Sequence, residues 1–190
     1  LNKTAINIAY SSRHISSDDV LERAAAIVGR QIENATESHF EANNRPKHWI
    51  KNCFALGAAA TNLEPLDATQ LHLLHLSFSL LRELFPQSTD YAAEAKIYNE
   101  KMQTYAEGMR DFIFARYHLN KRYDDKFWDE LREQTLPGSL KDRLDLFKSR
   151  GVISLFEDDV FLEEDWYALL VGSRQRAEML DPLMARIPDE

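Results

Sequence analysis

Residues 49–75, WIKNCFALGAAATNLEPLDATQLHLLH, decide the fold of this chain. Their first part is an apolar, β-forming run that predicts a strand over residues 47–56. Four small residues follow at 57–60, and after Pro65 an apolar helix is predicted to start at Asp67. Small side chains let a flat molecule lie against the main chain, and the free N–H groups of a first helical turn attract anions. The stretch therefore indicates a shelf for a cofactor beside an anion pocket.

The hydrophobic pattern outside this stretch predicts a mainly helical chain. Towards the N-terminus, alternation predicts a strand over residues 4–10, and Ser16 or Ser17 is placed to cap a helix whose apolar face runs to Ile32. Towards the C-terminus, we predict helices over residues 67–85, 91–112, 126–134 and 139–148. The first of these is apolar on nearly every face and is expected to be buried on most sides. The fold class is α+β, mainly α-helical.

The composition narrows the classes of partner. The 190 residues carry a net charge of −8 and a pI near 5.3, which argues against nucleic acid and against an anionic membrane as partners. No apolar run reaches the length of a membrane span. The single cysteine, Cys53, excludes an internal disulfide and is typical of a reducing compartment. We therefore expect a cytoplasmic protein that binds neither nucleic acid nor membranes.

Two groups of residues resemble a known family. Asn52-Cys53, Gly57-Ala58-Ala59 and the run LEPLDAT at residues 63–69 are similar to the NC…G-x-A-x-x-F-L-E-P-L-E-[SA]-T segment of the flavin-dependent tryptophan halogenases. The family's RDFI…Y…R-x-D…FW…R positions are matched in order by Arg110-Asp111-Phe112-Ile113, Tyr117, Arg122, Asp124, Phe127-Trp128 and Arg132. The resemblance covers nearly all of the chain. The two groups together, in the same order as in the family, are stronger evidence than either group alone.

The resemblance implies the C-terminal part of a flavin-dependent halogenase or monooxygenase-like fold, whose small sheet is completed by an N-terminal half. Because the chain begins at Leu1 without an initiator Met, we expect that half to be missing from the sequence. Residues 1–66 would complete the flavin-binding domain, and residues 67–190 would form a helical substrate or lid domain.

The activity implied by the resemblance belongs to the complete protein. It would use reduced FAD, supplied by a separate flavin reductase, with O2 and a halide ion to halogenate an electron-rich aromatic substrate such as tryptophan or an indole. We expect the chain alone neither to bind FAD tightly nor to halogenate. Whether it forms a homodimer is left open, as is the choice between chloride and bromide.

The resemblance also implies where the cofactor and the halide bind. Asn52, Gly57, Ala58 and Ala59 would lie along the isoalloxazine edge of the flavin, although tight packing of a strand on a helix also explains these small residues. The main-chain N–H groups of Thr69 and Gln70 would hold the halide. Gln70 stands where the family commonly has glycine, and its side chain either fills the pocket or donates its own amide to it.

Asp67 corresponds to a catalytic glutamate of the family. That glutamate is implied to position the oxidant, which a lysine of the N-terminal half steers, or to take the proton that the arene releases. The aspartate is one methylene shorter, and a displacement of about 1 Å can cost a catalytic group about a hundredfold in rate. Asp67 and Gln70 also have the pattern of a helix capping box, in which Asp67 accepts from the Gln70 amide. Capping and catalysis compete for one carboxylate, and the sequence leaves both open.

The substrate site is expected near the C-terminus, where Phe156, Phe161 and Trp166 are candidates to line it. The acidic runs at residues 157–159 and 163–165 lack the pattern of a calcium loop, and we expect them to be solvated. His72 and His75 lie three residues apart on the predicted helix but have no third ligand, which predicts core histidines and no metal site.

Two other classes of function remain open. The chain could belong to a halogenation-deficient flavoprotein hydroxylase or monooxygenase, which the substitutions at Asp67 and Gln70 would suit. Alternatively it could be a free-standing helical interaction module, in which the seam of apolar residues along 91–112 binds a partner helix.

Overall fold

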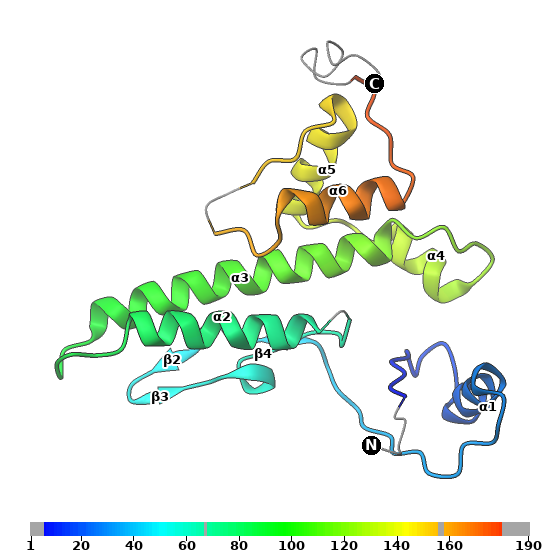
Figure 1. The fold of residues 1–190 in the computed structure, drawn as a ribbon, viewed down its shortest axis with the longest axis horizontal. Coiled ribbons are helices and arrows are strands. Elements are labelled where there is room, and N and C mark those ends of the chain that lie inside the picture. Colours follow the sequence, from blue (N-terminus) through cyan, green and yellow to red (C-terminus); the bar gives the residue numbers. More distant parts are fainter. Residues whose placement is uncertain (1–5, 67, 156–157, 180–190) are drawn as a thin grey trace, which may run out of the picture.

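The computed structural model describes residues 6–66, 68–155 and 158–179. In chain order its elements are α1 (Ser17–Val28), β1 (Asn43–Asn44), β2 (Trp49–Ile50), β3 (Cys53–Phe54), the 3-10 helix η1 (Gly57–Ala59), β4 (Thr61–Asn62), α2 (Thr69–Glu83), α3 (Ala92–His118), α4 (Lys126–Glu133), α5 (Gly138–Arg150) and α6 (Glu163–Gly172). Helices α2 and α3 lie side by side, with the short strands on one side and α5 and α6 on the other (Figure 1). The prediction of a mainly helical chain with little sheet is confirmed.

The first core lies between α2, α3 and the hairpin of β2 and β3. The ring of Trp49 stacks on Tyr91 with 5.5 Å between centroids, and meets Tyr98 edge-on at 5.9 Å. The buried members of this core are Trp49, Leu73, Leu80, Tyr98, Met102, Met109 and Ile113. The apolar seam predicted along α3 is therefore core, because Tyr98, Met102 and Met109 face α2 and the hairpin.

The second core joins α5 and α6 to the C-terminal part of α3. Its buried members are Phe112, Ala115, Leu140, Phe147, Ile153, Trp166 and Leu170. Phe161, from the loop before α6, packs against both cores. This one ring therefore connects the α2 side of the molecule to the α5 and α6 side.

The strands differ from the prediction. The chain reverses at Lys51, which has a φ of 53°, and β2 pairs antiparallel with β3, so residues 47–56 form a hairpin and not one strand. A second antiparallel pair joins β1 to β4. Residues 6–10 contain no strand, and the predicted strand over 4–10 is wrong for the residues that the structure describes. None of the described strands pairs with them, and a strand needs a neighbour for its N–H and C=O groups.

Helix α2 is less buried than predicted. It is buried at Leu73, Ser77 and Leu80, where it packs on the first core, but Leu71 and Phe78 remain 66% and 51% exposed. His72 and His75 are also exposed, so the prediction of core histidines is wrong. An apolar helix buries only the faces against which other elements pack, and the described residues supply partners for only part of its circumference.

The ends of the other helices follow local signals. Ser16 caps α1, as predicted, but Gly29 in the left-handed conformation ends the helix before Ile32. The predicted helix over 91–112 continues to His118. Helix α6 was not predicted, and it starts where the Leu162 N–H donates to the Asp165 carboxylate at 2.9 Å.

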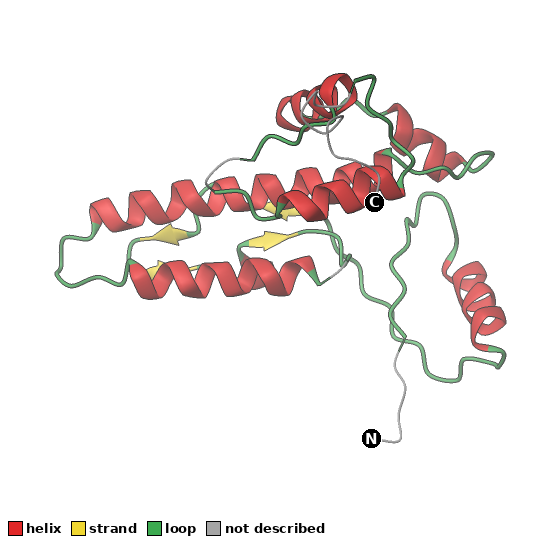
Figure 2. Ribbon diagram, turned by 45° about the horizontal axis from the view of Figure 1, so that its top comes forward, coloured by secondary structure: helices red, strands yellow, loops and turns green. Residues whose placement is uncertain are grey.

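Residues 6–42 extend from the helical body as an arm that carries α1 (Figures 1 and 2). The arm contacts α4 through His14, whose Nε2 lies 2.9 Å from a carboxylate oxygen of Glu130 and whose ring meets Phe127 edge-on. Within the described residues no helix is both long and apolar enough to cross a membrane.

Asn99 of α3 fixes the hairpin to the helical body. Its amide oxygen accepts from the main-chain N–H groups of His48 and Trp49 at 2.7 and 2.8 Å, and its Nδ2 donates to the Trp49 carbonyl at 2.9 Å. These bonds satisfy main-chain groups at the edge of a hairpin that is too short to stabilise itself. Asn99 therefore holds the start of the hairpin against α3.

We predict that Asn99→Leu lowers the free energy of unfolding by about 2–3 kcal/mol, because it leaves partly buried main-chain groups without partners. Urea unfolding followed by circular dichroism measures the change. Glu100→Leu is the matched control, since Glu100 is exposed and makes only a 3.9 Å contact with Lys96. Equal losses for the two variants would contradict the prediction.

Candidate active site

The predicted shelf is an exposed surface of small residues. Gly57, the first residue of η1, has a φ of 56°, a left-handed conformation that favours glycine. Ala58 and Ala59 are exposed, whereas Ala60 is 4% exposed and anchors the segment in the core. A planar ligand can therefore approach the main chain at Ala58, whereas at Ala59 the Arg45 side chain already donates a hydrogen bond from its Nε to the carbonyl oxygen at 2.5 Å.

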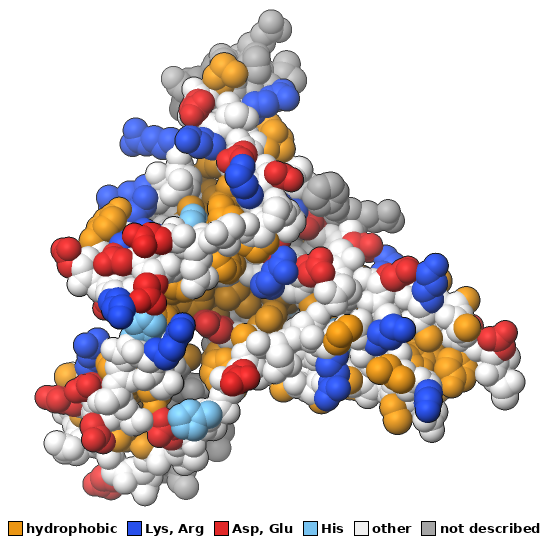
Figure 3. Space-filling view, turned by 180° about the vertical axis from the view of Figure 1, so that it is seen from behind, with side chains coloured by type: hydrophobic (Ala, Val, Ile, Leu, Met, Phe, Trp, Pro, Cys, Tyr) orange, Lys and Arg blue, Asp and Glu red, His pale blue; other side chains and the backbone are white. Residues whose placement is uncertain are grey.

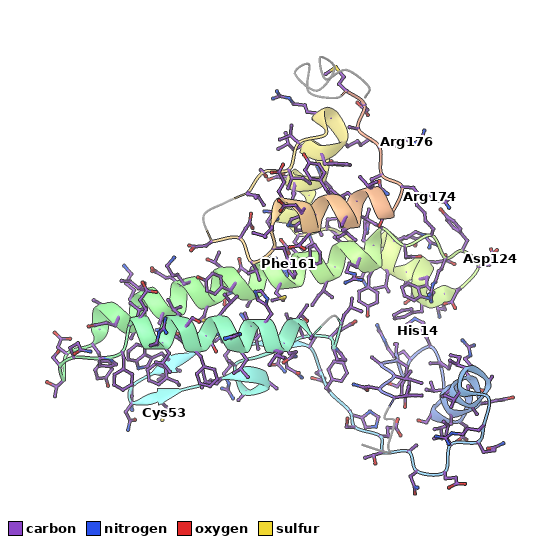
Figure 4. The ribbon with its side chains drawn as sticks, viewed as in Figure 1. His14, Cys53, Asp124, Phe161, Arg174 and Arg176 are labelled. Carbon is purple, nitrogen blue, oxygen red and sulfur yellow. The ribbon has the colours of Figure 1, made fainter. Side chains whose placement is uncertain are left out.

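Asn52 lies apart from the shelf. It sits at the turn of the hairpin, is exposed, and accepts a weak hydrogen bond from the Cys53 thiol at 3.7 Å. Cys53, its neighbour in the chain, points outward from the hairpin (Figure 4). The predicted cofactor contacts thus divide into the shelf at Gly57–Ala59 and a separate exposed amide at Asn52.

A main-chain hydrogen bond closes the turn before α2. Thr69 donates its N–H to the Leu66 carbonyl at 3.2 Å, and Ala68 adopts the left-handed conformation with φ 54° and ψ 25°. Helix α2 begins at Thr69 with Ala68 as its N-cap residue, two residues later than predicted. Asp67 lies outside the described residues.

We predict that Ala68→Gly stabilises the chain by about 0.5–1 kcal/mol. A left-handed alanine costs about 1–2 kcal/mol, and glycine removes this cost. Part of the resulting stabilisation is lost because glycine makes the unfolded chain more flexible. Thermal unfolding measures the effect. Ala93→Gly, at an exposed helical position of α3, is the control and should destabilise. Destabilisation by Ala68→Gly would show that the turn is not left-handed.

The Gln70 side chain turns away from the helix start and back towards β4. Its Nε2 donates to the Asn62 side-chain oxygen at 3.1 Å and to the Leu63 carbonyl at 2.8 Å. Both amide hydrogens are used, and the side chain has no donor left for an anion. Its main-chain N–H has no hydrogen-bond acceptor among the described residues. At position 70, therefore, only the main chain can bind a halide.

Thr69 adds an unusual feature to this turn. Its side chain is 3% exposed, and its hydroxyl oxygen is buried without a hydrogen-bond partner. A buried hydroxyl without a partner costs about 1–3 kcal/mol, and in native proteins such a group often marks a ligand or water site. The Thr69 hydroxyl and the Gln70 N–H are therefore two donors at the start of α2 that have no acceptor among the residues that the structure describes.

Two hollows meet at Gln70. The larger has a volume of about 1330 Å³ and lies between the arm and the segment that includes Asn62, Leu63, Pro65 and Gln70. The smaller, of about 10 Å³, is bordered by Gly57, Ala60 and Gln70 and is large enough for a single water molecule. The small void shows that Gly57 of the predicted shelf lies close to Gln70, a predicted halide-binding residue. The large hollow gives the turn a concave approach from the side of the arm.

The predicted substrate residues occupy different environments. Phe156 lies outside the described residues. Phe161 is half-buried and stacks on Phe112 with 3.8 Å between centroids, and on the exposed His72 of α2 with 6.3 Å (Figure 4). Trp166 is 1% exposed, and its indole N–H is buried without an acceptor. Phe161 is therefore only partly exposed, between Phe112 and His72, whereas Trp166 lies in the core and meets Phe112 edge-on.

The acidic residues before Phe161 are anchors and not a solvated surface, which corrects the prediction for Asp158 and Asp159. Asp158 pairs with Lys101 of α3 at 2.5 Å. Asp159 accepts two hydrogen bonds, at 2.9 and 2.8 Å, from Arg143 of α5, and the Arg143 guanidinium lies 4.5 Å above the Trp166 ring. The loop that carries Phe161 is thus tied to two helices. No group of three or more His, Cys, Asp or Glu side chains within the described ranges is arranged to hold a metal ion.

A buried polar group beneath the shelf was not predicted. His48 is 2% exposed, and its Nε2 lies 3.0 Å from the Asn44 side-chain oxygen, which also accepts from the Thr61 hydroxyl. Burial lowers the pKa of His48 and favours the neutral ring. Burial also raises the pKa of Tyr117, and a hydrogen bond with Glu64 raises it further. These residues hold the strands and the loop before α2 in place, and no local pattern in the sequence marks them.

These features place a small-residue shelf and a left-handed turn beside a helix start, on a mainly helical body. Solved structures with a similar fold include flavin-dependent halogenases. The chain is 29% identical to BrvH of Brevundimonas sp. BAL3, with a TM-score of 0.82 over 94% of this chain and 37% of that one. It is also 29% identical to Xcc4156 of Xanthomonas campestris, with a TM-score of 0.83 over 95% and 36%. The fold is therefore part of a halogenase fold.

The chain belongs to the tryptophan halogenase family, whose family model matches residues 1–189. Among curated relatives, it is 22% identical to tryptophan 7-halogenase RebH of Lentzea aerocolonigenes over 99% of this chain. That match covers 39% of RebH, and the match to tryptophan 6-halogenase ThaL of Streptomyces albogriseolus covers 28% of ThaL. The chain thus spans less than half the length of the relatives that it matches.

Proposed function

We propose that the chain supplies the halide turn, the inner flavin wall and the substrate-side helices of a flavin-dependent halogenase. The observation that carries this proposal is the juxtaposition of the open shelf at Gly57–Ala59 with the two free donors at Thr69 and Gln70. Main-chain amides at a helix start favour an anion, and exposed small residues favour a flat ring. The family membership supports the reaction class, and the juxtaposition supports this location for the site.

The residues present fit FAD and a halide at this place. Gly57, Ala58 and Ala59 would lie along the flavin ring, with Asn52 as a more distant contact. The Thr69 hydroxyl and the Gln70 N–H would donate to the halide, which would give the unpartnered hydroxyl an acceptor. When bound, reduced FAD would supply the chemistry that oxidises the halide with O2.

Asp67 is proposed as the group that handles the proton. A carboxylate beside the helix start can accept the proton that an aromatic carbon loses when it is halogenated. Phe161, held on Phe112 and by the Asp158 and Asp159 anchors, is proposed to contact the aromatic substrate, with Trp166 behind it. Phe156 would extend this surface, and a tryptophan or indole is the proposed substrate class.

We further propose the division and partners of the complete protein. Residues 1–66 would complete a flavin-binding domain that precedes this chain, and residues 67–190 would form the helical substrate domain. A separate flavin reductase would supply reduced FAD. The exposed thiol of Cys53 suits a reducing cytoplasm.

One observation favours a second candidate. The Thr69 N–H, which the family resemblance implied as a halide donor, donates to the Leu66 carbonyl, and both amide hydrogens of the Gln70 side chain donate to Asn62 and Leu63. A turn with fewer free donors binds a halide less well. A flavoprotein hydroxylase or monooxygenase that does not halogenate is therefore the alternative function.

The test joins this chain to the flavin-binding part of the Brevundimonas relative in one polypeptide. The joined protein, supplied with a flavin reductase, NADH, bromide and indole, is expected to bind FAD and to yield bromoindole, which mass spectrometry detects. The chain alone should do neither, and the intact Brevundimonas halogenase is the positive control. FAD binding that yields only hydroxylated indole would favour the second candidate. Tight FAD binding by the chain alone would contradict the proposed division.

A further inference from the structure

The Gln70 side chain closes the turn before α2 from the outside. Its Nε2 donates to the Leu63 carbonyl at 2.8 Å and to the Asn62 side-chain oxygen at 3.1 Å, so it ties the first turn of α2 to the end of β4. Between these two ends, the Thr69 N–H donates to the Leu66 carbonyl at 3.2 Å. We call the two side-chain hydrogen bonds the Gln70 clamp, and the clamp encloses the whole turn.

The turn needs outside support because its backbone is strained. Ala68 has a φ of 54°, and residues other than glycine rarely adopt this left-handed conformation. As the N-cap residue of α2, Ala68 also offers no side-chain hydrogen bond to the helix. A strained backbone persists only where the surrounding structure holds it in place. The Gln70 clamp provides such support at the point where the turn meets the helix.

The first turn of α2 leaves one main-chain donor for an anion. The N–H groups of Thr69, Leu71 and His72 donate to main-chain carbonyls at 3.2, 2.9 and 3.2 Å. The Gln70 N–H has no acceptor within the described ranges. A single N–H group binds an anion only when it points at the anion, so its direction matters more than at a helix start with several free donors. The clamp that fixes this direction is made by the side chain of the same residue.

The helical body places no charged side chain beside the clamp, among the residues that the structure describes. Its contribution to the lining of the 1330 Å³ hollow is Asn62, Leu63, Pro65 and Gln70. Seen from behind, hydrophobic side chains gather across the middle of the molecule, beside the arm (Figure 3). Without a cation nearby, an anion site depends on how N–H groups are oriented. The orientation of the turn should therefore set the affinity for a halide.

We propose that the Gln70 clamp is a positioning device for the halide, which holds the turn in the closed form that presents the Gln70 N–H to the anion. This inference rests on the proposed function and deepens it, because it names the side chain that sets the halide affinity. Without the clamp, the turn exchanges between closed and open forms. The apparent affinity then falls in proportion to the population of the closed form.

Gln70→Met tests the clamp in the chain alone, because methionine has a similar length and no donor. Loss of the two hydrogen bonds should make the Thr69 N–H exchange with solvent deuterium about tenfold faster, as measured by NMR. In the native chain, the main-chain N–H resonance of residue 70 should shift saturably when sodium bromide is added at constant ionic strength. Gln70→Met should raise the bromide concentration at half saturation by about tenfold.

Two further variants calibrate this result. Gln87→Met is the matched control and should change neither quantity, since Gln87 is exposed and donates to the Phe85 carbonyl at 3.2 Å. Asn62→Ala removes one acceptor of the clamp and should raise both quantities by about threefold. Asn62 also donates to the Glu41 carbonyl at 3.2 Å, but that carbonyl keeps its hydrogen bond from Asn43 at 2.9 Å. Melting temperatures establish that each variant is folded.

Three results would overturn the proposal. The first is an unchanged exchange rate of the Thr69 N–H in Gln70→Met, which would show that the clamp does not hold the turn. The second is faster exchange with an unchanged half-saturation by bromide, which would show that the clamp does not serve the halide. The third is the absence of a saturable bromide shift in the native chain.

The joined protein described above separates this proposal from the proposed function. There Gln70→Met should raise the KM for bromide by about tenfold and keep kcat within about twofold, because the closed turn is the same once it holds the halide. Bromide binding that Gln70→Met weakens, in a joined protein that yields only hydroxylated indole, would support the clamp and contradict the halogenase function. Bromoindole formation with a KM for bromide that Gln70→Met leaves unchanged would do the reverse.

Discussion

Replacing Asp67 with alanine is expected to lower the halogenation rate of the joined protein by about 10²–10⁴-fold, the usual contribution of a general acid–base group. Asp67 precedes Ala68, the N-cap residue of α2, in the sequence, and it corresponds to the family's catalytic glutamate. Alanine removes the only group proposed to take the proton. The rate of bromoindole formation under saturating FAD measures the effect.

Two matched variants separate catalysis from helix capping. Asp67→Asn keeps a side chain that can cap the helix but cannot take a proton. This variant should halogenate as slowly as Asp67→Ala and should have the melting temperature of the native protein. Asp67→Glu restores the length found in the family and should be at least as fast as the native residue. If Asp67→Ala changed the melting temperature but not the rate, the carboxylate would be a cap and not a catalytic residue.

Replacing Asp159 with alanine is expected to lower the free energy of unfolding by about 3–5 kcal/mol, because it leaves the charge of Arg143 buried without a partner. The two side chains are 9% and 15% exposed, and both Asp159 oxygens accept from the guanidinium. The free energy of unfolding of a typical domain is about 5–15 kcal/mol, so this loss would be a large fraction of the total stability. Chemical denaturation of the chain alone measures it.

The control is another ion pair of the same helix. Asp145 pairs with Lys141 at 2.5 Å, but both side chains are about 60% exposed, and Asp145→Ala should change the stability little. The double variant Arg143→Met with Asp159→Leu should recover most of the loss, since well-packed apolar residues can replace a buried pair. An unchanged stability in Asp159→Ala would show that the anchor of the Phe161 loop does not depend on this pair.

Local patterns predicted much of the secondary structure. The Ser16 cap and the apolar seam of α3 act through neighbours in the chain, and the structure confirms them. The hairpin at Lys51 was missed because a left-handed lysine has no sequence signal comparable to glycine. The strand predicted over 4–10 was wrong because strand formation depends on a partner, and no described strand supplies one.

The sequence by itself determined the family, the helical class and the succession of small residues and a helix start along the chain. These features depend on residue types at short spacing. Only the tertiary structure decided that Gln70 turns back to β4, that the Thr69 hydroxyl is left without a partner, and that Asp159 meets Arg143. Such contacts join residues whose separation along the chain carries no periodic signal. Their energies depend on burial, which the folded chain alone defines.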